Sequence, residues 1–358
     1  MPAAIREWPA WPEFTAPDAK TVLAENGADA LRQSWIKVCQ ELQAVTDEIV
    51  ERRNKIIPIF DTAQILAEGF SDAQQVKIKR VGSFICRATI SESETNILYE
   101  DMSRYVADNK QSIQAWPKDS PSMLIFPFLG LGPHIDAGSI CRWADAAYRK
   151  VYEDVFQGRL DTRDSFDIGV RKNADPALYQ AMAQWSVLRI FQGWTALTPT
   201  APREGTIMPP KNKDVDVMDP HTWTLDDKTG WFPGTFKTQS QRLSRASHPH
   251  LRLEECLVPV PKVNAGDTVW WHCDVCHAVD TEHLGKVNAA VAFIGSCPTT
   301  PVNTDYVKRQ LAATLEGRSP PDYALGGEAD LDERKLKGYA GLEGLSSEAR
   351  KAFRFQAS

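Results

Sequence analysis

Side chains that could bind a metal gather in two segments of this chain. The stretch "GDTVWWHCDVCHAVD", residues 266–280, carries two histidines, two cysteines, three aspartates and a pair of tryptophans. The stretch "LGPHIDAG", residues 131–138, carries His134 and Asp136. Imidazole, thiolate and carboxylate groups are the usual protein ligands of zinc and iron. The residue types alone are therefore compatible with a zinc site, a redox dithiol or an iron site.

The pair His134 and Asp136 has the H-x-D spacing that lets two ligands share one metal. Residues i and i+2 of a strand point to the same side. Seven histidines in a chain with 47 acidic residues give about one such pair by chance, so the pair alone is weak. His277 follows the Gly266–Asp267 turn and the strand expected after it. The three residues together would form a 2-His-1-carboxylate triad, which suits Fe(II) and oxygen.

The cysteines and the second H-x-D pair support competing interpretations. Cys273 and Cys276 form a C-x-x-C, but a redox dithiol would begin a helix in a βαβ context, and no amphipathic helix follows. A structural zinc site could use both cysteines with His272 and His283, although the chain has no second C-x-x-C. His272 and Asp274 could also replace His134 and Asp136 as the metal pair.

The order of the expected elements predicts the fold class. Residues 1–25 are expected to be an arm. The expected helices begin at Ala28 and cover 92–110 and 142–158. The expected strands are 76–90, 122–130, 185–199, two within 256–273 and one within 286–297. Helices followed by many short strands predict a mainly β protein with α additions, whose core is a double-stranded β-helix (jelly roll). We expect a single domain over 1–358, with the arm and helix in 1–75, the core in 76–304 and a helical tail in 305–358.

Composition limits the classes of partner. The 358 residues are 42% hydrophobic and 25% charged, with a net charge of −6, so we expect no nucleic acid or anionic membrane as partner. No export signal and no run of about 18 apolar residues is visible, which favours a cytoplasmic protein. Its seven cysteines are then expected to be free thiols. A homodimer through the arm or first helix stays open.

Five longer stretches resemble the DUF1479 family. They are "LGPHIDAGSICRWADAAYRKVYEDVFQG", "RIFQGWTAL", "HPHLRL", "NAGDTVWWHCDVCHAVDTEHLG" and "TPVNTDYVKRQ". The resemblance runs from about Val76 past Tyr323, and the spacing from Gly266 to His277 is similar to that of phytanoyl-CoA hydroxylases. The family is placed among the Fe(II)/2-oxoglutarate-dependent oxygenases. The resemblance implies a jelly-roll fold and the iron ligands His134, Asp136 and His277. It also implies that four residues near His277 support the site or line the pocket rather than bind the metal. They are His272, Cys273, Asp274 and Cys276.

The resemblance also implies a basic residue that pairs with the far carboxylate of 2-oxoglutarate. Many relatives have an arginine about ten residues after the second histidine, whereas this chain has Lys286 and Asn288 there. Arg189 ranks first as the anchor because a strand position can point into the core, and Lys286 and Arg142 are the alternatives. Val291 and Phe293 are expected to line the substrate pocket with Trp194, Trp270 and Trp271. The loop 218–235 is a candidate lid.

The implied activity is oxidation of an unactivated C–H bond of a small molecule, such as an amino acid or specialised metabolite. It uses Fe(II), 2-oxoglutarate and O2, and it releases succinate and CO2. Hydroxylation, desaturation and ring closure all remain open as outcomes. The alternatives are a metal-binding cupin that is non-catalytic or an isomerase, and a structural zinc protein that uses Cys273 and Cys276.

Overall fold

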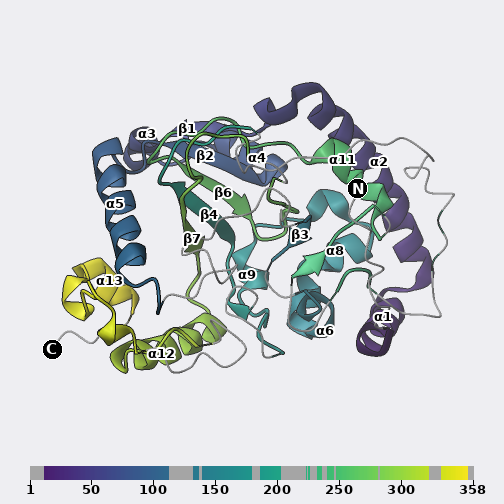
Figure 1. The fold of residues 1–358 in the computed structure, drawn as a ribbon. Coiled ribbons are helices and arrows are strands. Elements are labelled where there is room, and N and C mark those ends of the chain that lie inside the picture. The colour runs from purple at the N-terminus through teal and green to yellow at the C-terminus, as the bar shows by residue number, and fades with distance from the viewer. Residues whose placement is uncertain are drawn as a thin grey trace.

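A five-stranded mixed sheet lies at the centre of the computed structural model (Figure 1). The structure describes residues 12–112, 132–136, 139–179, 186–202, 223, 225, 232–235, 240–245, 247–280, 283–321 and 332–353. The strands are β1 (Ile59–Asp61), β2 (Ser83–Arg87), β3 (His134–Ile135), β4 (Phe191–Ala196), β5 (Gln241–Arg242), β6 (Thr268–His272) and β7 (Val291–Ser296). The central sheet has the order β1-β2-β6-β4-β7, and β3 and β5 form a separate antiparallel pair. Only the β1–β2 pairing in the central sheet is parallel.

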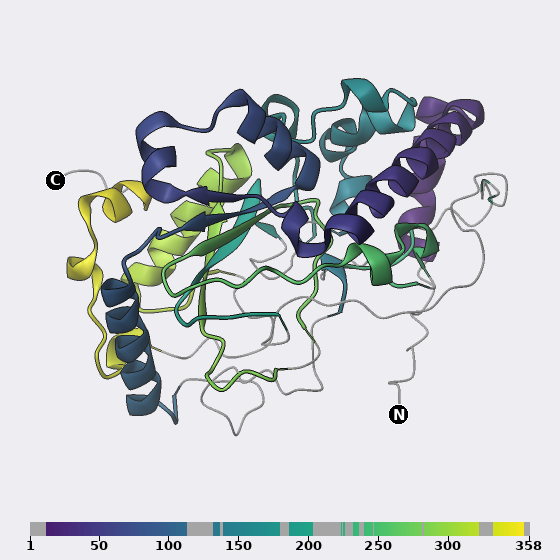
Figure 2. The ribbon, with the colours of Figure 1, turned by 90° about the horizontal axis from the view of Figure 1, so that it is seen from above.

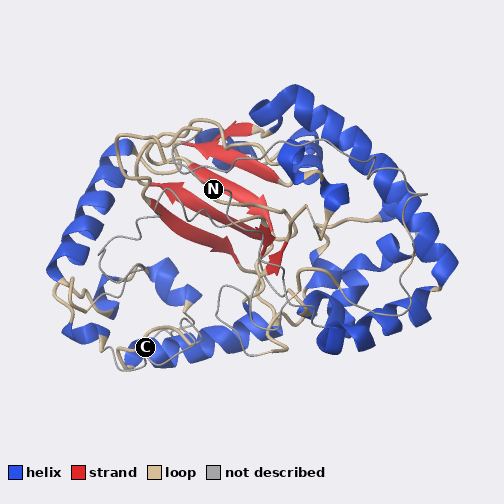
Figure 3. Ribbon diagram, turned by 45° about the vertical axis from the view of Figure 1, so that its right-hand side comes forward, coloured by secondary structure: helices blue, strands red, loops and turns tan. Residues whose placement is uncertain are grey.

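Helices surround this sheet (Figure 3). They are α1 (Pro12–Asn26), α2 (Ala28–Arg52), α3 (Thr62–Glu68), α4 (Asp72–Val81), α5 (Glu92–Asp108), α6 (Cys141–Ala144), α7 (Ala146–Arg149), α8 (Glu153–Phe156), α9 (Ile168–Arg171), α11 (Leu253–Cys256), α12 (Pro301–Leu315) and α13 (Ser347–Ala352). Figures 1 and 2 place α1 and α2 on one side of the strands, with α5, α12 and α13 on the other. None of the described helices combines the length and apolar character needed to cross a membrane.

Two apolar clusters cover opposite faces of the sheet. Ile85 packs with Val269 and Ala196 in one cluster. The preceding residue, Phe84, packs with Phe60 in the other. Successive side chains of a strand point to opposite faces, so β2 contributes to both clusters. The sheet is therefore buried on both sides at this point, and it can serve as a rigid base for the loops at its end.

The predicted mainly β jelly roll is wrong. About 48% of the described residues are helical and 12% are in strands, and the strands form a five-stranded mixed sheet with a separate pair. Short apolar segments were interpreted as strands wherever they lacked an obvious helical period. The described strands are only two to six residues long. Much of the remaining apolar sequence therefore lies in helices and loops that pack against the sheet.

The segment 76–90 shows the cause of this error. The letters "VKIKRV" alternate apolar and charged residues, a pattern that predicts a strand. These residues nevertheless end α4, which begins with a capping box between Ser71 and Gln74 and ends at Gly82 with φ of +75°. The strand covers only Ser83–Arg87. The capping box at the start of α4 and the glycine at its end stabilise the helix, and they outweigh the alternating pattern that favours a strand.

Other expectations had mixed outcomes. The helices expected at Ala28 and over 92–110 are present as α2 and α5. The single helix expected over 142–158 is a series of short helical pieces, and the expected arm contains α1. The strand expected over 122–130 lies outside the described residues, as does most of the candidate lid 218–235.

Candidate metal centre

His134 and His277 lie side by side because their backbones pair directly. The two residues form an isolated antiparallel bridge. The His134 amide donates to the His277 carbonyl at 2.9 Å, and the His277 amide donates back at 3.0 Å. On its other edge β3 pairs with β5, where His134 lies opposite Arg242. The first histidine is thus held on both sides by strand pairing.

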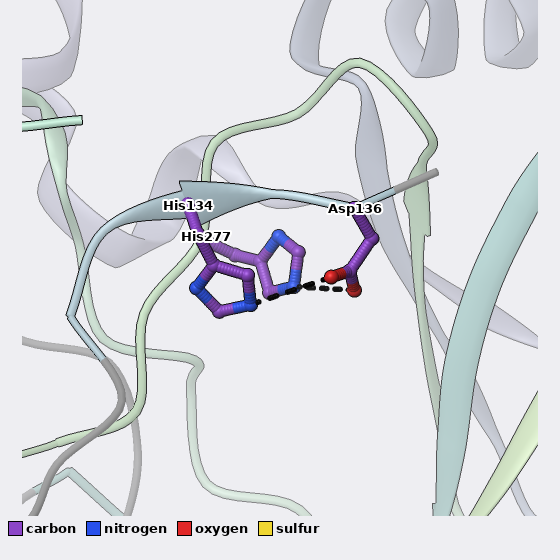
Figure 4. A group of neighbouring side chains, drawn as sticks. All are labelled: His134, Asp136 and His277. Atoms are coloured by element: carbon purple, nitrogen blue, oxygen red, sulfur yellow. Dashed lines mark ion pairs between the residues drawn. The ribbon is translucent and has the colours of Figure 1, made fainter. Parts of the chain in front are cut away.

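Asp136 joins the two histidines in one cluster (Figure 4). Its carboxylate lies 3.7 Å from Nε2 of His134 and 3.4 Å from Nε2 of His277. One donor atom from each of the three residues lies within 4.8 Å of the others. The structure therefore brings these three residues together, while their role as iron ligands stays a prediction.

Backbone carbonyls orient both imidazoles. Nδ1 of His134 lies 2.7 Å from the carbonyl oxygen of Gly132, and Nδ1 of His277 lies 3.1 Å from that of Val275. A carbonyl oxygen can only accept, so each Nδ1 carries the proton. Each Nε2 is then left with a lone pair directed toward Asp136. This arrangement, with the second ring nitrogen bound to the backbone, is typical of metal-binding histidines.

The protonation states also suit a cation. Burial lowers the pKa of His134 to about 4, and the neighbouring His277 adds to the effect. Burial tends to raise the pKa of Asp136, but the adjacent His277 and His134 side chains, with the charge of Arg189, bring it below its usual value. At neutral pH the centre therefore offers a neutral imidazole and a carboxylate, which are the forms that bind metals.

A buried ionic network connects the backbone of the two segments that carry this centre. Arg142, which is 2% exposed, donates to the backbone carbonyls of Asp136 and Cys273 at 2.7 and 3.0 Å. Its other terminal nitrogen contacts the Asp274 carboxylate and the Tyr152 hydroxyl. Arg171, also fully buried, donates to Asp274 at 2.6 Å. The resemblance implied a supporting role for Asp274, but sequence reasoning did not name its partners Arg142 and Arg171, which come from distant helices.

The second potential metal cluster is occupied by protein partners. Ligand atoms of His272, Cys273 and Asp274 lie close together. However, Arg142 and Arg171 already neutralise Asp274 and keep its pKa far below the usual range against the effect of burial. Burial raises the pKa of both Cys273 and Cys276 to about 12, so both thiols are protonated at neutral pH. Within the described ranges, neither Cys276 nor His283 joins a group of three potential ligands.

The expected anchors of 2-oxoglutarate occupy different environments. Arg189 precedes β4, and its charge acts on Asp136, so it lies near the centre. Lys286 and Asn288 are exposed. Arg142 uses its terminal nitrogens for the network just described, and that arrangement favours a supporting role. Of the four candidates, Arg189 is therefore the one whose position best suits an anchor of 2-oxoglutarate. The anchoring role itself stays a prediction.

Four of the five expected pocket residues share one face of the sheet. In the register of β4, Trp194 lies opposite Val269 and Phe293, while Gln192 lies opposite Trp271. Directly opposite residues point to the same face, so Trp194, Trp271, Phe293 and Val291 are on one face. The Trp271 ring centroid lies 5.0 Å from that of His277. Trp270 points to the other face, where it packs with Phe84.

Gln192 is a residue of this face that the sequence did not reveal. It is 5% exposed and lies in the middle strand of the three that carry the expected pocket residues. A buried amide in the middle of the apolar-aromatic run "RIFQGWTAL" was the available signal.

A family model for Gig2-like proteins matches residues 12–126 and 127–355. The chain belongs to the Gig2-like family. A curated relative, the uncharacterized protein YbiU of Escherichia coli K12, is 33% identical over 199 residues, which are 54% of this chain. The matched stretch spans only 46% of YbiU. The expected DUF1479 resemblance is supported, because a solved Gig2 protein is described with that family label.

Solved structures with this fold are described under several names. The Candida albicans protein GIG2 (DUF1479) has a TM-score of 0.72 at 21% identity, over 95% of this chain and 93% of its own. A Salmonella typhimurium LT2 protein described as a "Putative Oxidoreductase" has a TM-score of 0.77 at 20% identity, over 97% of this chain and 98% of its own. The hypothetical protein JW0805 of Escherichia coli has a TM-score of 0.74 at 22% identity, over 96% of this chain and 97% of its own. At these identities the likeness shows a shared fold.

Proposed function

We propose that this Gig2-like protein is an Fe(II)/2-oxoglutarate-dependent oxygenase that oxidises a C–H bond of a small molecule. The observation that carries the proposal is the convergence of His134, Asp136 and His277, with both Nε2 atoms directed at one carboxylate. Two imidazoles and one carboxylate are the donor set of non-haem Fe(II) oxygenases. The description of the Salmonella relative as an oxidoreductase agrees with this class.

The residues present fit a ferrous ion better than a structural zinc ion. Structural zinc sites use four ligands with thiolates among them, whereas among the described residues neither Cys273 nor Cys276 joins the group formed by His134, Asp136 and His277. Ferrous iron with 2-oxoglutarate supplies oxidation of the substrate by O2, with release of succinate and CO2. The chain's own contribution is to orient the two imidazoles through backbone carbonyls and to hold the Asp136 segment through the Arg142 contact with its carbonyl. Arg189 supplies positive charge beside the centre.

An anaerobic titration tests the proposal. Metal-free protein receives Fe(II) and then 2-oxoglutarate while the visible spectrum is recorded. We expect a weak charge-transfer band that needs both additions and that is absent from His134→Ala and His277→Ala. A matched control is His272→Ala, because His272 is equally buried but belongs to the neighbouring cluster.

Two results would overturn the proposal. Iron bound by the triad without any band after 2-oxoglutarate would instead support a metal protein of another class. Zinc retained by Asp136→Ala and lost from the double variant Cys273→Ser/Cys276→Ser would support a structural zinc site. The proposed oxygenase predicts the opposite for iron, with loss in Asp136→Ala and retention in the double variant.

A further inference from the structure

Two buried hydrogen-bond donors near the metal centre lack an acceptor among the described residues. The side-chain nitrogen Nε2 of Gln192 and the indole nitrogen Nε1 of Trp271 are both buried, and neither has a hydrogen-bond partner in the part of the chain that the structure describes. Gln192 is only 5% exposed. A buried donor without an acceptor costs about 1–3 kcal/mol, so proteins rarely keep one without a reason. Here two of them occur in directly paired residues.

Both side chains lie on the face of the sheet that meets the metal centre. Gln192 of β4 is the register partner of Trp271 of β6, so the two point the same way. The Trp271 ring is in turn 5.0 Å from the His277 ring. The unsatisfied donors are therefore next to a proposed iron ligand, rather than in the apolar cluster farther along the same strands.

Arg189 adds positive charge on the same face. The β7 partner of Gln192 is Gly295. A Cβ at Gly295 would lie 3.2 Å from Cδ and 3.5 Å from Cγ of Arg189, so the Arg189 stem occupies the space that a side chain would take. The Arg189 charge also acts on Asp136. One amide donor, one indole donor and the Arg189 stem thus lie on one face of the sheet, and the Trp271 ring of that face lies beside His277.

We infer that Gln192 and Trp271 form a donor pair that binds a carboxylate or keto oxygen of an organic acid held beside the metal centre. The pair supplies two N–H donors and Arg189 supplies the opposite charge. Organic anions with several oxygen acceptors are the ligands that this combination suits. The inference rests on the proposed function for the identity of the metal, but the donor pair itself is present without metal.

The experiment compares organic-acid binding to the wild type, Gln192→Leu and Trp271→Phe. The probes are 2-oxoglutarate and succinate, each titrated calorimetrically into metal-free and anaerobic Fe(II)-loaded protein. Loss of one donor to a charged acceptor is expected to weaken binding about 10- to 100-fold. Weakening for both probes assigns the pair to a carboxylate, and weakening for 2-oxoglutarate alone assigns it to the keto-acid end. A wild-type affinity that iron does not increase would count against the proposed function alone.

Stability separates a binding role from a structural one. Removing a buried donor that lacks an acceptor should leave the melting temperature of the ligand-free protein unchanged or higher. Gln192→Leu should therefore keep or gain stability and lose the stabilisation by organic acid. The control is Thr195→Val, which is buried in the same strand on the opposite face and should bind both probes as the wild type does.

A spectroscopic readout reports on Trp271 directly. The indole N–H signal that disappears in Trp271→Phe should move downfield when the acid binds to the wild type, because the N–H gains an acceptor. The inference is overturned if Gln192→Leu and Trp271→Phe bind both probes within twofold of the wild type. It is equally overturned if Gln192→Leu lowers the melting temperature of the ligand-free protein while the indole signal stays in place.

Discussion

The Nη2 atom of Arg142 donates a 2.7 Å hydrogen bond to the backbone carbonyl of Asp136. The same guanidinium contacts Asp274, three residues before His277 in the sequence. Arg142 therefore connects the two segments that supply the candidate ligands. This finding turns a residue that was a candidate anchor of 2-oxoglutarate into a residue that positions the ligand set.

Replacing Arg142 should weaken metal binding. In Arg142→Met the Asp136 carbonyl loses its donor and Asp274 loses one of its two buried arginine partners. Residues that orient metal ligands typically contribute 10- to 100-fold in affinity, and we expect a loss of that size for Fe(II). Anaerobic titration with a competing chelator measures it. Arg149→Met is the matched control, because Arg149 donates to the carbonyls of Trp143 and Ala144 away from the centre. Equal affinities in the two variants would contradict the positioning role.

Acidification should destabilise the protein well above the range of carboxylate titration. Burial lowers the pKa of His134, His248, His250 and His272 to about 4 from the ordinary 6.5. Between pH 6.5 and pH 4 the unfolded chain binds protons that the folded protein does not, so stability falls as pH falls. Thermal melts at pH 7.5, 6.0 and 5.0 should give decreasing midpoints.

His250→Phe provides the control for that pH dependence. The His250 ring lies among the rings of Trp35 and Trp223, where an apolar ring is tolerated. Its removal eliminates one titrating group, so the midpoint should fall less between pH 7.5 and pH 5.0 than in the wild type. An identical fall in both proteins would show that His250 does not contribute.

The cysteines should differ sharply in reactivity. Cys297 is exposed, and the charge of Arg189 opposes the rise that desolvation causes in its pKa, whereas Cys273 is buried and burial raises its pKa to about 12. Alkylation requires an accessible thiolate, so iodoacetamide at pH 8 should modify Cys297 first and Cys273 only after unfolding. Peptide mass spectrometry measures the order, and Cys297→Ser should abolish the early product. Early modification of Cys273 would show that the buried network opens readily.

Two glycines with similar backbone angles should respond differently to alanine. Gly27 and Gly266 have φ of +83° and +87°. A Cβ at Gly27 meets nothing within 4 Å, whereas at Gly266 it would lie 2.1 Å from the Ile90 carbonyl oxygen. Gly27 combines φ of +83° with ψ of 148°, so Gly27→Ala should cost about 1–3 kcal/mol from the backbone alone. Gly266→Ala should cost more than about 3 kcal/mol in urea unfolding, since the turn that leads into β6 must shift. Similar losses would contradict the steric argument.

The sequence identified the candidate ligands better than the fold that holds them. His134, Asp136 and His277 could be named because ligand types and spacing are local properties, and the family resemblance joined the two segments. The fold class failed where local alternation, as in "VKIKRV", competed with helix capping at Ser71 and Gly82. The roles of Arg142, Arg171 and Gln192 depend on partners far away in the sequence, which a single sequence does not reveal.

The pairing of His134 with His277 also determines when the centre can form during folding. More than a hundred residues separate these two positions, so bringing them together requires closure of a long loop. Contacts of such sequence separation form slowly. The unfolded chain therefore has no preformed site, and a metal that binds this centre stabilises the folded state alone. Metal acquisition would then mark the completion of folding, and a chelator would act on the unfolding equilibrium as well as on the chemistry.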